Sequence, residues 1–146
     1  MKELKEQAGS KQGKKQLKPN NIVIVPASLE TDFFQRWCTF LRPFVKLTDR
    51  ELDVAACFLK HRYELSKIIS DPAVLDAHLM SNTTKEKIIE ECKISPKHFY
   101  VVLSKLKKGK VIVNNTINPR LIPNIRQDDN GEFRLLLLFK DEHKSA

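Results

Sequence analysis

The sequence predicts an α+β fold that is mainly helical, and two observations support this class. Apolar residues recur every three or four positions from about residue 31 to residue 108, which is the spacing of helices that bury one face. After Gly109 the pattern changes to short β-branched runs separated by Asn and Pro, which is typical of strands and tight turns. The chain has 146 residues, 41% of them hydrophobic, so it is long enough to enclose a core.

We expect two segments ahead of the main domain. Residues 1–20 hold six lysines, two glutamates and few apolar side chains, which predicts a disordered basic tail. Residues 21–46 begin with the apolar run Ile22–Val25, which predicts a short strand. An aromatic helix follows at about 31–41, where large side chains share one helical face: Phe33, Phe34, Trp37, Phe40 and Leu41. Such a face packs either in the core or against another subunit, and both alternatives stay open.

Residues 47–141 are expected to form the main domain, and its first helix begins at Thr48. Thr48 and Glu51 have the spacing of a capping box, in which each side chain bonds the backbone N–H of the other residue. A shorter helix is predicted from Asp71 to Met80, because Asp is a favoured cap and the proline after it suits the first helical position.

Two more helices, joined by a tight turn at Lys93–Ile94, are predicted over residues 83–110. Thr83 and Glu86 have capping-box spacing at the start of the first of these helices. Its apolar residues recur at helical spacing: Ile88, Ile89 and Cys92.

The second helix of this pair is expected at residues 95–108. Ser95 offers a cap oxygen, and Pro96 suits the first helical position. Gly109 is expected to end the helix in the left-handed conformation that glycine often adopts there. The helix has a core-facing stripe at i, i+3, i+4 and i+7: Phe99, Val102, Leu103 and Leu106.

Two hairpins are predicted in the C-terminal part of the chain. The first joins Val111–Val113 to Thr116–Ile117 through two asparagines, which tolerate the positive φ of a tight turn. The second pairs about 121–126 with 132–139 across an Asp-Asp-Asn-Gly turn. Leu135–Phe139 is apolar on both faces, so we expect it to be covered by the N-terminal strand or by another subunit.

Positive charge is concentrated in two stretches of a chain whose net charge is +8. One is the basic tail. The other is residues 93–110, which hold six lysines and no acidic residue, whereas residues 21–92 hold nine basic and eleven acidic residues. A basic cluster on one helix is typical of a nucleic-acid-binding protein, and the alternative is a solvated lysine face.

The order of helix, tight turn, second helix and strand over about residues 47–126 resembles the winged helix-turn-helix superfamily. This resemblance implies that residues 95–108 are a recognition helix, that the C-terminal hairpin is the wing, and that the partner is double-stranded DNA. It also implies a role in the regulation of transcription or replication. The side chains expected to face DNA are Lys97, His98, Tyr100, Val101, Ser104, Lys105, Lys107, Lys108 and Lys110.

A second class of function also stays open. The chain could be a structural or adaptor subunit of a larger nucleoprotein assembly, such as a phage virion or a packaging or connector complex. In size and style it is similar to small phage proteins with winged-helix-like domains. Contacts with further copies or with other subunits would then use the aromatic helix at 31–41 and the apolar strand at 135–139.

The sequence lacks the usual motifs of catalysis and metal binding. Cys38, Cys57 and Cys92 form no C-x-x-C pair and lie in apolar helical patterns, so we expect buried reduced thiols. The four histidines match no zinc spacing, and we expect neither an enzyme nor a metal or cofactor site. No apolar run approaches the roughly 20 residues of a membrane span, and the N-terminus lacks an apolar signal region. We therefore expect a cytoplasmic protein, or a virion component under the second class of function.

Overall fold

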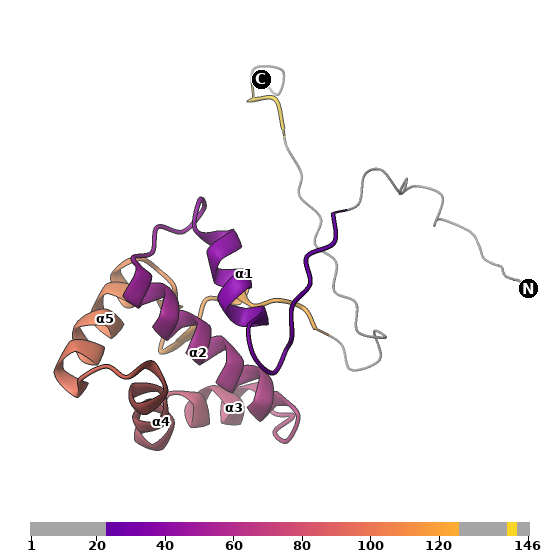
Figure 1. The fold of residues 1–146 in the computed structure, drawn as a ribbon. Coiled ribbons are helices and arrows are strands. Elements are labelled where there is room, and N and C mark those ends of the chain that lie inside the picture. The colour runs from indigo at the N-terminus through magenta and orange to yellow at the C-terminus, as the bar shows by residue number, and fades with distance from the viewer. Residues whose placement is uncertain (1–22, 126–139, 143–146) are drawn as a thin grey trace, which may run out of the picture.

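The computed structural model of the chain describes residues 23–125 and 140–142 and has a mainly helical α+β fold, as predicted (Figure 1). The helices of the described part are α1 (Phe33–Leu41), α2 (Asp49–Ser66), α3 (Pro72–Leu79), α4 (Asn82–Cys92) and α5 (Pro96–Lys108). They are followed by strands β1 (Ile112–Val113) and β2 (Thr116–Ile117) and by a short 3₁₀ turn, η4 (Pro119–Leu121). The tail at 1–20 and the strand expected at 132–139, with its apolar run Leu135–Phe139, lie outside the described residues.

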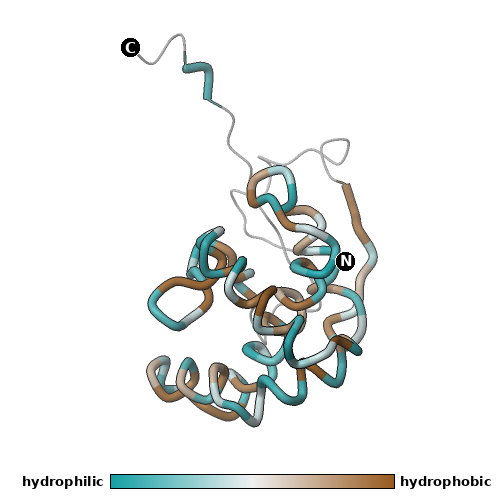
Figure 2. The backbone as a smooth tube through the Cα atoms, turned by 90° about the vertical axis from the view of Figure 1, so that its left-hand side faces the viewer, coloured by the Kyte–Doolittle hydropathy of each residue, from teal (hydrophilic) through white to brown (hydrophobic). Residues whose placement is uncertain are grey.

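Helix α2 is the centre of the fold, because it contacts each of the other four helices (Figure 1). Its first turn has the predicted capping box. The Thr48 hydroxyl accepts a hydrogen bond from the Glu51 N–H at 3.3 Å, and the Glu51 carboxylate accepts one from the Thr48 N–H at 3.1 Å. Apolar and polar stretches alternate along the helices in Figure 2, as expected when each helix buries one face.

The core between α2 and α5 is built on two phenylalanines. Phe58 of α2 and Phe99 of α5 have no solvent exposure, and their ring centroids lie 6.2 Å apart. Burying a side chain of this size contributes roughly 1.5–3 kcal/mol. The predicted stripe of α5 is confirmed, because its remaining members are buried as well: Val102, Leu103 and Leu106.

Helix α1 places most of its aromatic face in the same core. Phe34 and Trp37 are buried, and the Trp37 indole N–H donates to the Leu121 carbonyl at 2.8 Å. That bond ties α1 to the segment after the hairpin. The face is not covered throughout, since Phe40 and the nearby Phe44 are 39% and 64% exposed.

Helix α5 ends at Lys108 as predicted, but the left-handed residue after it lies one position later than the glycine rule predicts. Gly109 has an ordinary φ of −81°, and Lys110 takes the left-handed conformation with φ 63°. The Val111 N–H donates to the Leu106 carbonyl at 2.9 Å, which is the six-to-one bond of a Schellman motif. Val111 and Leu106 are both buried. Burial of Val111 therefore determines where the chain turns, and it leaves Lys110 in the left-handed conformation.

Helix α4 also departs from the predicted ends. Its N-cap is Ser81, not Thr83, because the Ser81 hydroxyl accepts from the Thr84 N–H and the buried Thr84 hydroxyl donates to the His78 carbonyl at 2.9 Å. At its other end Lys93 has a left-handed φ of 52°. That conformation turns the chain sharply toward α5.

The β-structure agrees with the prediction in one hairpin and departs from it elsewhere. Asn114 and Asn115 both have positive φ, and Ile112 pairs with Ile117 across the turn, as the two-asparagine pattern predicts. The predicted strand at 22–25 is wrong over residues 23–25, which form no strand and are exposed. Residues 121–125 also form no strand, since Leu121 ends the 3₁₀ turn η4 and residues 122–125 are irregular.

Candidate nucleic-acid interface

The solvent-facing side of α5 brings the predicted site residues together. All nine of them are exposed. Directly opposite the buried stripe, a row runs along the helix at spacings of four, three and four: Lys97, Val101, Ser104 and Lys108. Tyr100 and Lys105 flank this row, and His98 and Lys107 lie at its margins. Lys110 stands just beyond the helix end.

In the part of the chain that the structure describes, this surface carries positive charge without acidic partners. Residues 93–110 contain no acid. Within residues 23–125 and 140–142, no acidic side chain forms an ion pair with a lysine of α5 or with Lys110. Lys105, Lys107 and Lys108 lie in the last turn, where they also complement the negative end of the helix dipole. The face is therefore suited to a polyanion.

Two apolar side chains interrupt the basic surface. Tyr100 is 49% exposed and Val101 is 46% exposed. The Tyr100 ring lies edge-on to Phe99, with centroids 5.2 Å apart, so its base is held by the core while the rest reaches solvent. An exposed aromatic ring and an exposed branched side chain on a basic helix offer apolar contacts beside the charges.

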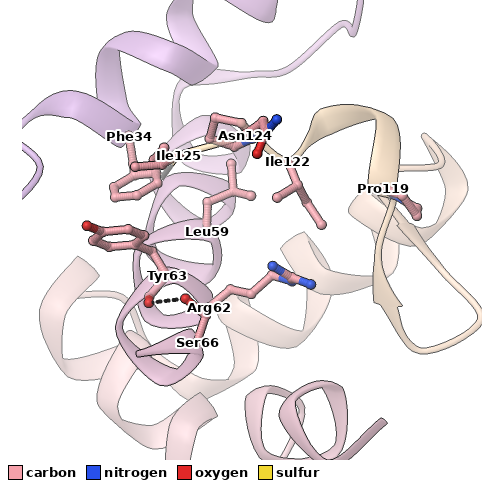
Figure 3. Close-up of a pocket in the computed structure, with 10 residues that line it drawn as sticks. Phe34, Leu59, Arg62, Tyr63, Ser66, Pro119, Ile122, Asn124 and Ile125 are labelled. Atoms are coloured by element: carbon pink, nitrogen blue, oxygen red, sulfur yellow. Dashed lines mark hydrogen bonds between the residues drawn. The ribbon is translucent and has the colours of Figure 1, made fainter. Parts of the chain in front are cut away.

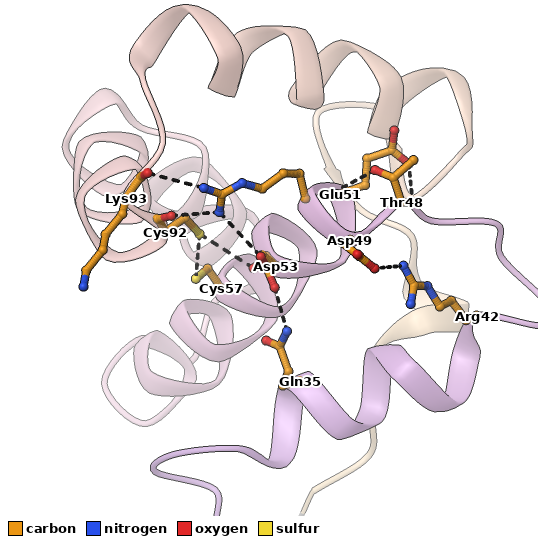
Figure 4. A network of polar contacts seen from close by, with 10 residues as sticks. Gln35, Arg42, Thr48, Asp49, Glu51, Asp53, Cys57, Cys92 and Lys93 are labelled. Carbon is orange, nitrogen blue, oxygen red and sulfur yellow. Dashed lines mark hydrogen bonds and ion pairs between the residues drawn. The ribbon is translucent and has the colours of Figure 1, made fainter.

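The direction of α5 depends on a polar network that joins three helices (Figure 4). Arg50, in the first turn of α2, donates from Nη1 to the Cys92 carbonyl at 2.9 Å and from Nη2 to the Lys93 carbonyl at 3.4 Å. Asp53 forms an ion pair with Arg50 at 3.5 Å and accepts a hydrogen bond from Gln35 of α1 at 2.7 Å. The guanidinium thus caps the end of α4 where the chain turns into α5.

Sequence reasoning missed this network, although a weak signal was present. Arg50 and Asp53 are three residues apart, a spacing that is typical of an ordinary surface ion pair on one helix. Their partners on α1 and α4 are distant in sequence, so only the fold brings them together.

The hairpin lies next to the C-terminal end of α5. The Asn118 side chain donates to the Lys110 carbonyl at 2.9 Å and accepts from the Arg120 N–H at 3.1 Å. These two bonds hold the exposed residues Lys110 and Arg120 on one short stretch of surface. Asn118 is a second positioning residue that the sequence pattern did not single out.

A separate cavity of about 390 Å³ lies between α1, α2 and residues 119–125 (Figure 3). Its walls are mostly apolar, with Phe34 and Leu59 among them. Arg62 is its charged residue, and Arg62 Nε pairs with Asp76 Oδ1 at 4.0 Å without forming a hydrogen bond. None of the predicted site residues lines this cavity.

Within the described residues, no three His, Cys, Asp or Glu side chains are grouped so that they could hold a metal ion. The same residues include no helix with the length and apolar content needed to cross a membrane. No protein-family model, curated protein or solved structure matches this chain. What α5 presents to solvent is therefore the basis for assigning a function.

Proposed function

We propose that this chain is a double-stranded DNA-binding protein of the winged helix-turn-helix type, with α5 as its recognition helix and a role in transcription or replication. One observation carries the proposal: the outward face of α5 holds lysines that have no acidic partner among the described residues, while the opposite face is fixed in the core. A helix presented in this way fits the width of the B-DNA major groove.

The residues of α5 divide into two groups along the helix. Lys97, Tyr100 and Val101 lie in its N-terminal half, where a recognition helix contacts base edges, and the Val101 methyl groups suit the methyl group of thymine. Lys105 and Lys108 lie in the C-terminal half and, with Lys110, suit phosphates. In this proposal the β1–β2 hairpin and Arg120 serve as the wing next to these lysines.

The residue types on α5 also bear on specificity. The helix has no Arg, Asn or Gln, which are the side chains that most often form paired hydrogen bonds with bases. Affinity should therefore come mainly from phosphate contacts and fall steeply with salt, while sequence preference stays modest.

The experiment is fluorescence anisotropy of the full chain with labelled duplexes of random sequence, at two salt concentrations, together with light scattering for mass. The proposal expects a monomer or dimer whose duplex affinity decreases strongly between low and physiological salt. Failure to bind any duplex at low salt would contradict it.

A second function is favoured by a different observation, namely the exposed apolar side chains outside α5. Val23 and Ile24 are 88% and 82% exposed, and Phe44 is 64% exposed. Such side chains suit contact with another protein, as in a structural or adaptor subunit of a nucleoprotein assembly. A large defined oligomer that binds no duplex, found in the same experiment, would favour this function over the first.

A further inference from the structure

Two cysteines that are far apart in sequence lie in contact between α2 and α4. Cys57 Sγ and Cys92 Sγ are 3.2 Å apart, although the residues are 35 positions apart, and neither is in a disulfide (Figure 4). A disulfide bond between them would need the sulfurs to approach to about 2.05 Å. The remaining movement of the two sulfurs is therefore about 1 Å.

Polar contacts on both sides of the thiols hold the two helices at this distance. On one side Arg50 of α2 donates to the Cys92 carbonyl at 2.9 Å. On the other side His61 Nε2 of α2 lies 3.0 Å from Glu91 Oε1 of α4. Arg50, Cys57 and His61 lie seven and four residues apart along one side of α2. The two polar contacts therefore lie on either side of the thiol pair.

The surroundings give the two sulfurs different roles. The hydrogen bond between the two thiols lowers the pKa of Cys92, and this effect outweighs the opposing effect of burial. The same hydrogen bond, with burial, raises the pKa of Cys57. Cys92 is therefore the first of these two thiols to lose its proton as the pH rises. Burial raises the pKa of the third thiol, Cys38, to about 12, which makes it a poor nucleophile.

We propose that Cys57 and Cys92 are an oxidation site, at which a hydroperoxide converts the two thiols to an intramolecular disulfide that cross-links α2 to α4. An attacking thiolate beside a second thiol that resolves the first product is the arrangement found in redox-sensitive cysteine pairs. Access is through the surface near Cys57, which is half-buried, whereas Cys92 is 9% exposed.

The reaction has two steps. The Cys92 thiolate attacks one oxygen of hydrogen peroxide, the O–O bond breaks, and the hydroxide that leaves takes up a proton to become water. Cys92 is then a sulfenic acid. The Cys57 sulfur attacks the Cys92 sulfur to form the S–S bond, and the sulfenic hydroxyl leaves as a second water with the Cys57 proton. The thiols lose two electrons in total, and these reduce the peroxide.

The cross-link joins α2 to α4 next to the turn into α5, and it closes a loop that contains α3. Closing this loop restricts the unfolded chain, so the oxidised protein should unfold at a higher temperature than the reduced protein. The inference does not depend on DNA binding, because it concerns only the thiols and the packing of α2 on α4.

The test uses the full chain, fully reduced and then treated with hydrogen peroxide. Thiols counted under denaturing conditions should fall from three to one, and a digest analysed by mass spectrometry should contain a linked pair of peptides from Cys57 and Cys92. The midpoint of thermal unfolding should rise by several degrees and return to its starting value with dithiothreitol. The peptide map is made on the unaltered chain, so it does not depend on how a variant folds.

Matched variants separate this site from general oxidation. Cys38→Ala should still lose two thiols, whereas Cys57→Ser and Cys92→Ser should form no intramolecular disulfide. Three free thiols after treatment, a bond that includes Cys38, or a disulfide-linked dimer on a non-reducing gel would overturn the inference.

Discussion

Arg50 Nη1 donates a hydrogen bond to the backbone carbonyl of Cys92 across 2.9 Å, so the first turn of α2 caps the last turn of α4. A helix C-terminus leaves carbonyls without partners and carries partial negative charge. A guanidinium can donate hydrogen bonds to these carbonyls, and its positive charge offsets the negative end of the helix. Because only three residues separate the end of α4 from the start of α5, this contact also helps to fix where α5 starts. One arginine on the central helix therefore supports the helix that we propose for DNA recognition.

We predict that Arg50→Ala lowers the free energy of unfolding by about 1 kcal/mol, measured by urea denaturation. Hydrogen bonds from a charged group are usually stronger, but the Arg50 side chain is 43% exposed and solvent weakens the contact. Arg50→Lys should not restore the loss, because an ammonium cannot reach both carbonyls as the forked guanidinium does.

Arg36→Ala is the matched control for this prediction. Arg36 pairs with Asp32 at 2.9 Å on the surface, where such pairs contribute little, so its removal should change stability much less than Arg50→Ala does. Equal effects of the two alanine variants would contradict the capping role of Arg50.

We predict that Lys105→Ala with Lys108→Ala weakens duplex binding for all sequences and lowers the slope of log affinity against log salt by about 2. Each lysine that meets a phosphate releases about one counterion, so removing two should remove about two from the slope. Fluorescence anisotropy across a series of salt concentrations measures both quantities.

The matched control removes the same charge from α2 and its C-cap by Lys60→Ala with Lys67→Ala. Neither residue lies on α5, so the salt slope should stay close to that of the unaltered chain. The same reduction in both double variants would mean that net charge, and not the face of α5, determines binding.

Local signals in the sequence were sufficient to find the helices. Thr48, Asp71 and Ser95 each cap the helix that was predicted to follow, because a cap depends only on neighbouring residues. The exposed residues of α5 followed from the same periodicity that identified its buried stripe. What these exposed residues bind was inferred from their charge and remains a proposal.

Contacts between distant residues could not be read from local patterns. Trp37 donates to Leu121, and Cys57 contacts Cys92, only because the fold brings their elements together. The strand expected at 22–25 failed for a related reason. An apolar run becomes a strand only where another strand pairs with it, and residues 23–25 have no such neighbour among the described residues.

We predict that Tyr100→Ala changes sequence preference more than mean affinity. Tyr100 lies in the N-terminal half of α5 with its ring 49% exposed, where contact with bases is expected and contact with phosphates is not. Selection of preferred sites from random duplexes, made with both proteins, measures the change. An equal loss on every duplex would mean that the ring only packs or stacks.

Tyr100→Phe distinguishes the hydroxyl from the ring. If the ring supplies apolar contact, the phenylalanine variant should keep the preference of the unaltered chain. If the hydroxyl bonds a base edge, the preference should change as it does with alanine.

The left-handed lysine after α5 leads to a prediction that composition alone would not suggest. Lys110 has φ 63°, a conformation that costs a residue with a side chain roughly 1–2 kcal/mol and costs glycine almost nothing. Gly109 has φ −81°, which any residue adopts, and a Cβ there would lie 3.4 Å from the Lys105 carbonyl oxygen. The glycine and the strained position are therefore neighbours and not the same residue.

We expect Lys110→Gly to raise the free energy of unfolding by about 0.5–1 kcal/mol, since glycine also has more freedom to lose on folding. Gly109→Ala should be neutral or slightly stabilising, because alanine has less conformational freedom than glycine to lose on folding. Lys107→Gly, inside α5, is the control and should destabilise by about 1 kcal/mol. Urea denaturation measures all three. A loss of stability in Lys110→Gly would show that the lysine side chain itself stabilises the end of α5 by more than the backbone strain costs.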